Sequence, residues 1–141
     1  MNTEAIRDQI KRHEGCVLHA YQDHLGYWTI GYGRLIDERR GGGISEGEAE
    51  QLLTHDIARV IGDLEQRIDF LHRLPESAQH ALVNMGFQLG VNGVMSFSRM
   101  LDALEQGDWE LAAEEALDSR WAEQTPRRAH EVAKMIAGES Q

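Results

Sequence analysis

Cysteine, proline and aromatic residues are scarce in this sequence: among 141 residues there are one cysteine, two prolines and 6% aromatic residues. A single cysteine, Cys16, excludes a disulfide within the chain, so nothing points to an oxidising compartment. No apolar run approaches the roughly 20 residues that span a bilayer, so we expect no membrane insertion. The first residues are polar and lack the apolar core of a signal peptide, so we expect synthesis in the cytoplasm.

Basic residues are also few, with 14 Lys and Arg against 24 Asp and Glu, which gives a formal net charge of −10. Proteins that bind nucleic acid usually carry a basic patch, so this balance argues against a nucleic-acid partner. The same charge would slow encounter with any anionic target at low salt. The simpler interpretation, which we favour, is that the acidity provides solubility.

The length is typical of one domain, so we treat residues 1–141 as a single domain. Residues 21–36 are rich in Tyr, Trp, Thr, Ile and Gly, which predicts short antiparallel strands. A glycine-rich loop, residues 39–45, follows them. Ser45 and Glu48 then form a capping box, and apolar residues at helical spacing from Leu53 to Ile68 predict a long helix.

The rest of the sequence predicts consecutive helices joined by short loops. Their expected limits are Pro75 to a stop at Gly90, Val94 to Gly107, a start near Asp108, and Pro126 to Gly138. The predicted fold class is α+β, predominantly α, with two lobes. A small antiparallel β lobe covers approximately residues 14–44, and a larger helical lobe covers 45–141 together with the amino-terminal helix. The long helix joins the two lobes.

Two carboxylates and a hydroxyl stand out near the amino terminus. Glu14 follows a short amphipathic helix, Asp23 comes nine residues later, and Thr29 follows six residues after that. Glycosidic bond cleavage needs one carboxylic acid to protonate the leaving oxygen and a second carboxylate to activate water or to attack. Taken singly, each residue is better explained as a solvated or capping side chain.

The surrounding pattern is more specific. The stretch E-G-(x)5-Y-x-D-(x)2-G-(x)2-T-I-G-Y-G, residues 14–33, closely resembles glycoside hydrolase family 24, the phage-type lysozymes. Two later stretches resemble the same family in the same order. They are NMGFQLG at residues 84–90, and SRW with QTP and RA at residues 119–129.

The resemblance implies a muramidase that hydrolyses the β-1,4 bond between N-acetylmuramic acid and N-acetylglucosamine in peptidoglycan. It implies Glu14 as the general acid, with Asp23 and Thr29 positioning or activating water. Arg128 would pair with Glu14 and orient it. It further implies a phage or prophage endolysin that acts after release through a holin-type pore or lysis, and a monomer as the family default.

The resemblance also suggests a substrate-binding set. Gln88 is expected to hydrogen bond the sugar acetamides and Phe87 to line the cleft, and Gly33 is a further expected substrate-binding residue. Large aromatic residues at helical spacing are usually core residues, and on that ground we place Trp109 and Trp121 in the core. The role of Trp28 stays open.

The sequence departs from the family at Arg34, where the family commonly has histidine. Asp56 on the long helix occupies the position of the partner carboxylate, so we predict an Arg34–Asp56 ion pair. Arginine stays protonated throughout, so this pair would lack the pH switch of a histidine. The histidines do not form metal-ligand pairs at helical spacing, so we expect no metal and no cofactor.

Two alternative functions remain open. A lytic transglycosylase needs one acidic residue and leaves an anhydro sugar; the presence of Asp23 and Thr29 beside Glu14 favours hydrolysis instead. A non-catalytic module could retain the scaffold to bind peptidoglycan or a partner protein.

Overall fold

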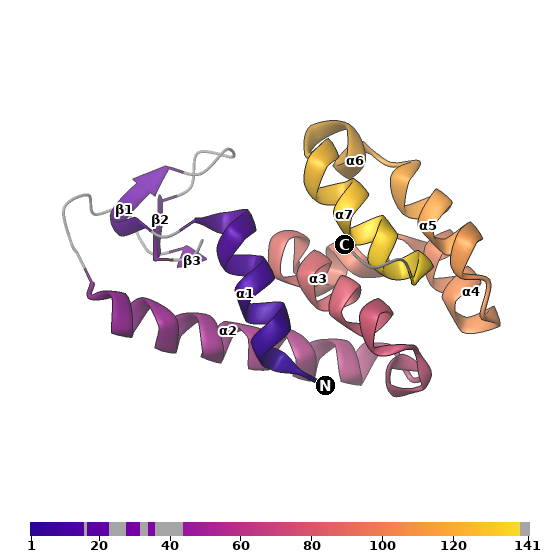
Figure 1. Ribbon diagram of the computed structural model, residues 1–141, viewed down its shortest axis with the longest axis horizontal. Helices are drawn as coiled ribbons and strands as arrows, with labels where there is room; N and C mark the ends of the chain where they lie inside the picture. The colour runs from indigo at the N-terminus through magenta and orange to yellow at the C-terminus, as the bar shows by residue number, and fades with distance from the viewer. Residues whose placement is uncertain (16, 23–27, 32–33, 36–43, 139–141) are drawn as a thin grey trace. The chain divides into compact units, whose positions relative to one another are not determined.

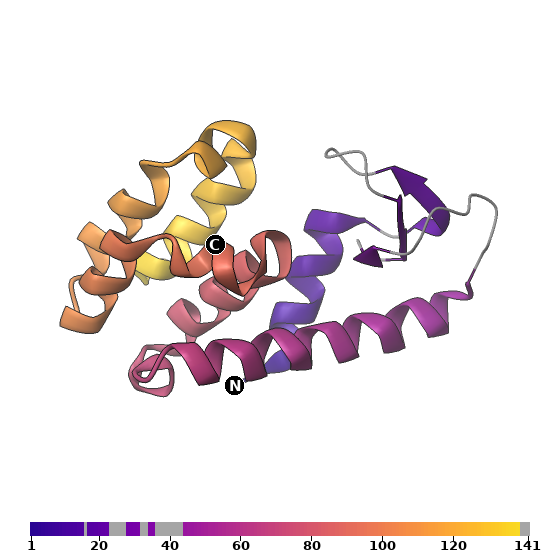
Figure 2. The ribbon, with the colours of Figure 1, turned by 180° about the vertical axis from the view of Figure 1, so that it is seen from behind.

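The computed structural model describes residues 1–15, 17–22, 28–31, 34–35 and 44–138, with the strand residues described by their backbone. The chain divides into two compact units. One, the N-terminal unit, is Thr3–Arg59. The other, the helical unit, is Val60–Gln141 together with Met1–Asn2. Figure 1 shows the elements of both units, and Figure 2 shows them from behind.

The N-terminal unit begins with helix α1, Thr3–Glu14, whose apolar side is buried at Ile6 and Ile10. The helix ends at Gly15, which has φ 68 and donates its backbone N–H to the Lys11 carbonyl over 2.9 Å. Glycine reaches this left-handed conformation without the steric cost of a Cβ, which explains why α1 stops here. Glu14 is therefore the last residue of a helix with a defined end.

An antiparallel sheet in the order β1-β2-β3 follows, with β1 Val17–Gln22, β2 Trp28–Gly31 and β3 Arg34–Leu35. The register pairs Thr29 of the central strand with Tyr21 on one side and with Leu35 on the other. An irregularity interrupts the β1–β2 register between Val17 and Tyr21. The antiparallel strands expected from this part of the sequence are confirmed.

Helix α2, Glu46–Arg67, begins with the predicted capping box. The Glu48 N–H donates to Ser45 Oγ over 3.1 Å, and the Ser45 N–H donates to Glu48 Oε1 over 3.2 Å. These two bonds satisfy backbone donors that lack partners at a helix start. The predicted apolar stripe is buried at every position: Leu53, Ile57, Val60, Leu64 and Ile68.

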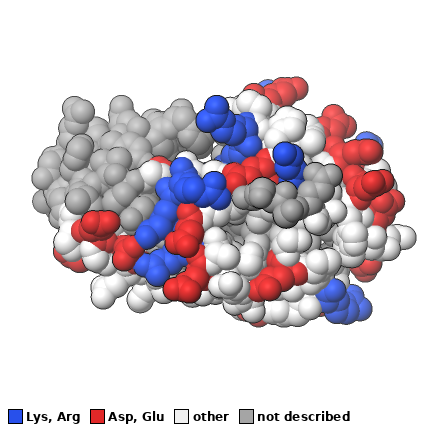
Figure 3. Space-filling view, in the orientation of Figure 1, with Lys and Arg blue, Asp and Glu red and all other residues white. Residues whose placement is uncertain are grey.

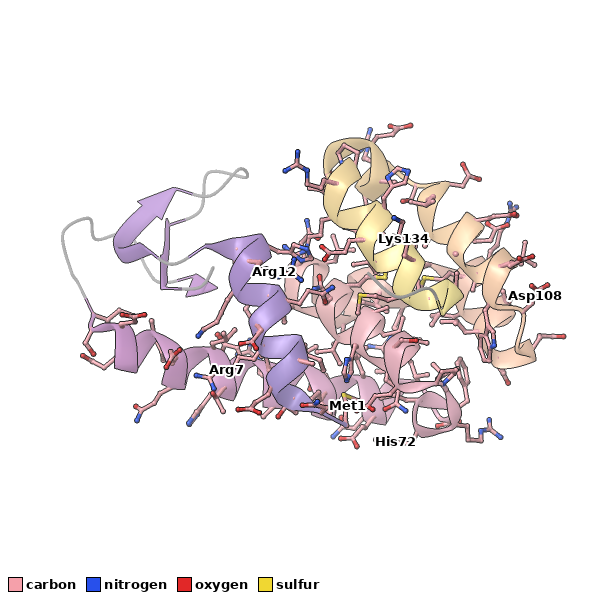
Figure 4. The ribbon with its side chains drawn as sticks, viewed as in Figure 1. Met1, Arg7, Arg12, His72, Asp108 and Lys134 are labelled. Carbon is pink, nitrogen blue, oxygen red and sulfur yellow. The ribbon has the colours of Figure 1, made fainter. Side chains whose placement is uncertain are left out.

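Within the N-terminal unit, an ion-pair cluster links α1 to α2. Glu50 of α2 accepts a hydrogen bond from the Lys11 ammonium and lies 3.2 Å from Arg7 Nη2. Figure 4 labels Arg7 on α1. The hydrogen bond and charge of Lys11, with a smaller contribution from Arg7, lower the pKa of Glu50.

The helical unit contains the second part of α2 and further helices in chain order. They are the 3-10 helix η1 Leu71–Arg73, α3 Glu76–Met95, α4 Ser98–Gln106, α5 Trp109–Leu117, α6 Arg120–Gln124 and α7 Pro126–Ala137. Helix α7 packs against α3, α5 and α6, and α4 packs against α5. The core of this unit includes fully buried Leu82, Met85, Met100 and Leu104.

Most predicted helix limits in this unit are confirmed. Gly90 has φ 78 and ψ 161, which interrupts α3 at the predicted stop, although helical structure resumes and continues to Met95. Gly107 and Gly138 end α4 and α7 in the left-handed conformation. Asp108, labelled in Figure 4, caps α5 by accepting from the Leu111 N–H over 3.2 Å.

One helix prediction in this unit is wrong, and one helix was missed. The helix that ends at Gly107 begins at Ser98, so Val94 belongs to α3 and Phe97 lies between the two helices. Helix α6 was not predicted from the sequence, because five residues are too short for a periodic pattern to appear.

The predicted fold class, α+β with a β lobe, is wrong. The described protein is helical almost throughout, and its strands have only six, four and two residues. These strands do not form a lobe of their own, because they share one compact unit with α1 and the first part of α2. The residues rich in Tyr, Thr and Ile do pair as strands, but they are too few to bury a core without helices.

The outer face of α4 and α5 carries much of the negative charge. Figure 3 shows acidic side chains gathered along this part of the surface, and the exposed ones include Asp102, Glu105, Asp108, Glu110 and Glu114. Among the described residues, no helix is both long and apolar enough to cross a membrane.

Candidate active site

The two predicted carboxylates differ in how much the structure says about them. Glu14 is the last residue of α1, which holds its backbone, and the residue as a whole is half-buried. Asp23 and Gly33 lie outside the described residues. Thr29 lies in the middle of the central strand β2, with its backbone paired on both sides. Their assignment as catalytic or binding residues stays a prediction.

Arg128 of the helical unit is half-buried in the first turn of α7. Its Nε donates a hydrogen bond to Oδ1 of Asn84 on α3 over 2.9 Å. Asn84 has no exposed surface. The sequence analysis quoted Asn84 as part of a motif but gave it no role. The available signal was an amide flanked by buried apolar residues in the middle of a helix.

Gln88 lies on α3 one turn after Asn84, and its amide oxygen is occupied. The Trp121 Nε1–H donates to Gln88 Oε1 over 2.8 Å. Phe97 meets Trp121 edge to face, with ring centroids 5.9 Å apart and an interplanar angle of 86°. Trp121 is 5% exposed, which confirms its place in the core. Trp109 is only half-buried, so the core prediction for it is wrong.

A cavity of 570 Å³ opens beside Trp121 in the helical unit. Apolar side chains from α3, α4 and α6 form part of it, while its charged residues include both signs. The charged residues are Arg99, Glu115, Asp118 and Arg120. Most of the residues that line this cavity are polar or charged, so it lacks the mainly apolar lining of a typical ligand pocket.

The remaining predicted residues have partial descriptions. Phe87 is half-buried on α3, next to Gln88. Asp56 is 4% exposed, and one oxygen lies 3.6 Å from Arg59 Nη2. The side chain of Arg34 is outside the described part, so the Arg34–Asp56 pair stays a prediction. Within the described residues, no group of three or more His, Cys, Asp or Glu residues is arranged to hold a metal.

Comparison with known proteins identifies the family. The family model for phage lysozyme matches residues 11–134, which include every predicted catalytic residue. The chain therefore belongs to the phage lysozyme family. It is a lysozyme-type muramidase, a glycoside hydrolase with peptidoglycan as its substrate.

Individual relatives agree with this. The chain is 30% identical to the probable T4-type lysozyme 1 of Dictyostelium discoideum, covering 94% of this chain and 93% of that protein. It is 34% identical to the endolysin of Acyrthosiphon pisum secondary endosymbiont phage 1, covering 80% and 74%. It is also 33% identical to the pre-baseplate central spike protein Gp5 of Enterobacteria phage T4, of which it spans only 27%.

Proposed function

We propose that this lysozyme hydrolyses the β-1,4 bond between N-acetylmuramic acid and N-acetylglucosamine, with Glu14 as the general acid. The main support is the family match across residues 11–134, a range that includes Glu14, Asp23, Thr29 and Arg128. The half-buried position of Glu14 at the fixed end of α1 suits a carboxyl that must stay in one place.

In the proposed reaction, Glu14 donates its proton to the glycosidic oxygen as the bond to the anomeric carbon breaks. Asp23, aided by the Thr29 hydroxyl, accepts a proton from the water that attacks this carbon, so the anomeric configuration inverts. The products are a free sugar hydroxyl and a new reducing end. Glu14 ends deprotonated and Asp23 protonated, and exchange with solvent restores both.

Residues of the helical unit have supporting roles in this proposal. Arg128 is the proposed catalytic-support residue for the general acid. The indole N–H of Trp121 occupies the amide oxygen of Gln88, which leaves the Gln88 NH₂ group as the donor for an acetamide carbonyl of the substrate. Phe87 and Gly33 complete the proposed set of substrate-binding residues.

The similarity to a phage endolysin supports a role in host lysis. We propose that the protein acts as a monomer and reaches the wall from the cytoplasm after a holin-type pore or lysis opens the membrane. Cells that express the chain alone should keep their turbidity until chloroform permeabilises the inner membrane. Lysis without permeabilisation would contradict this route.

The test of the catalytic assignment is the clearing of chloroform-permeabilised Gram-negative cells by the wild type and by Glu14→Gln. Loss of general acid catalysis should reduce the rate by about 100-fold or more. Glu4→Gln is the matched control, because Glu4 is exposed in the first turn of the same helix. Equal clearing by the wild type and Glu14→Gln would refute Glu14 as the acid. A wild type that sediments with sacculi but clears nothing would indicate the non-catalytic binding module.

A further inference from the structure

Asn92 on α3 is followed directly by Gly93. The sequence contains three asparagines, Asn2, Asn84 and Asn92, and only Asn92 precedes a glycine. In an Asn-Gly pair the backbone nitrogen of the glycine can reach the side-chain amide carbon, because glycine has no Cβ to hinder the approach. Asn92 is exposed, so water reaches its side chain, whereas Asn84 has no exposed surface.

The kink of α3 lies just before this pair. Gly90 has φ 78 and ψ 161, so the regular helix is interrupted and resumes only for residues 91–95. A helical segment this short opens at a lower free-energy cost than the interior of a long helix. The backbone nitrogen of Gly93 is therefore more available for reaction than a nitrogen in the first part of α3.

Arg67 of α2 places a positive charge at the oxygen of the reacting amide. Its Nη1 donates to Asn92 Oδ1 over 2.9 Å, and both residues are exposed parts of the helical unit. Attack of a nucleophile on Asn92 Cγ turns this oxygen into an oxyanion. A charged donor that is already in place stabilises such an oxyanion.

We propose that Asn92 is a site of spontaneous deamidation, and that Arg67 accelerates the reaction. The Gly93 nitrogen forms a bond to Asn92 Cγ and loses its proton. The bond from Cγ to Nδ2 breaks, and the amide nitrogen takes up this proton and leaves as ammonia. Water then opens the cyclic imide. Cleavage between Cγ and the Gly93 nitrogen gives aspartate, and cleavage of the other carbonyl–nitrogen bond gives isoaspartate.

The two products should differ in their effect on stability. Asn92→Asp, the equivalent of the first product, keeps the backbone and faces Arg67, so Tm should change little, as for other exposed ion pairs. Isoaspartate inserts one extra carbon into the backbone next to Gly93. A Cβ built on Gly93 would lie only 2.8 Å from Leu89 Cβ, so the backbone here has little room to rearrange. The isoaspartate form should therefore have a lower Tm.

The test is peptide mapping by mass spectrometry after incubation of the native protein in mildly alkaline buffer. The tryptic peptide 74–99 contains both Asn84 and Asn92, so its fragments report the site and an internal control. Deamidation should accumulate at Asn92 and not at Asn84. Arg67→Gln should lower the rate at Asn92 by roughly 3- to 10-fold, the value of one hydrogen bond. Arg73→Gln, which removes an exposed arginine of η1, should keep the wild-type rate.

Urea provides a second comparison, because unfolding removes the contact of Arg67 with Asn92. In the unfolded chain, the wild type and Arg67→Gln should deamidate at the same rate. A native wild type that converts Asn92 no faster than Asn84 would overturn the proposal. A native Arg67→Gln variant that deamidates as fast as the wild type, or faster, would refute the role of Arg67, and a faster rate would mean that the hydrogen bond protects the amide.

Discussion

The indole Nε1–H of Trp121 donates a hydrogen bond to Oε1 of Gln88 over 2.8 Å, which joins α6 to α3 inside the helical unit. A buried tryptophan needs an acceptor for its N–H, and Gln88 supplies it. The bond also fixes which end of the carboxamide is the donor, since Oε1 faces the indole. The Gln88 oxygen thus has a structural role, and the NH₂ group is the donor that we propose for the substrate.

The variant Gln88→Glu separates these two roles. The carboxylate still accepts from Trp121, so the free energy of unfolding should change by less than about 1 kcal/mol. The donor toward the substrate is lost, so KM should rise about tenfold, the equivalent of one hydrogen bond. Enzyme kinetics on peptidoglycan measure KM, and urea unfolding measures the free energy of unfolding. Gln106→Glu, at the exposed end of α4, controls for the added charge. An unchanged KM would exclude Gln88 from substrate binding.

Two helical glycines should respond to alanine in opposite directions. A Cβ at Gly86 would lie 2.8 Å from Val60 Cγ1, whereas a Cβ at Gly62 meets nothing within 4 Å. Gly62→Ala should stabilise the protein by about 0.5–1 kcal/mol through helix propensity. Gly86→Ala should destabilise the protein by roughly 1 kcal/mol, because the steric cost of the added Cβ against Val60 exceeds the gain in helix propensity. Urea unfolding of both variants checks this, and equal shifts would disprove the close approach of α2 and α3.

His80 should make stability depend on pH. Its side chain is 13% exposed, and burial lowers its pKa despite the opposing charge of Glu76 at 3.4 Å. Because the pKa of His80 is lower in the folded protein, the unfolded chain binds a proton at higher pH than the folded protein does. The contribution of neutral His80 to the free energy of unfolding is therefore complete above about pH 6.5 and is lost as the pH falls further. His80→Gln should therefore flatten the fall in Tm between roughly pH 7 and pH 5.

Exposed His55 gives the control, since His55→Gln removes a histidine without altering a buried group. Glu76 contributes to the pH dependence of stability at lower pH. Its pKa is lowered mainly by the hydrogen bond that it accepts from the Asn2 backbone N–H over 2.6 Å. Its contribution is lost below about pH 4.5, outside the window of His80. A wild-type slope in His80→Gln would show that other groups cause the pH dependence.

The contribution of the α2 capping box to the free energy of unfolding should be measurable by itself. Ser45→Ala removes the acceptor of the Glu48 N–H and should lower the free energy of unfolding by about 1 kcal/mol. Thr54→Ala, in the interior of the same helix, should be neutral or slightly stabilising because alanine has the higher helix propensity. Chemical denaturation of both variants checks the pair. A loss at position 54 equal to that at position 45 would argue against a specific capping effect.

Local chemistry made much of the fold predictable. Ser45 and Glu48 mark the start of α2 because their side chains accept hydrogen bonds from backbone N–H groups there. Gly107 and Gly138 mark helix ends because glycine adopts the left-handed conformation without steric cost. The apolar spacing from Leu53 to Ile68 predicted a buried stripe. What failed was the fold class, because sequence patterns do not tell whether short strands form a lobe or join neighbouring helices.

The candidate site was predictable only in part. The motif around Glu14 pointed to the chemistry, but no spacing rule connects Asn84 with Arg128 or Gln88 with Trp121. These pairs are 44 and 33 residues apart, so only tertiary packing brings them together. Trp109 shows that helical spacing does not always predict burial, since the residue was expected in the core and is only half-buried.

The most direct test of the central claim is digestion of purified peptidoglycan in ¹⁸O-labelled water, followed at once by borohydride reduction and mass spectrometry of the fragments. Hydrolysis with Glu14 as the acid predicts muramic acid reducing ends that carry one ¹⁸O from the wild type, and none above background from Glu14→Gln. Anhydro ends without label, or labelled fragments of equal yield from Glu14→Gln, would contradict it.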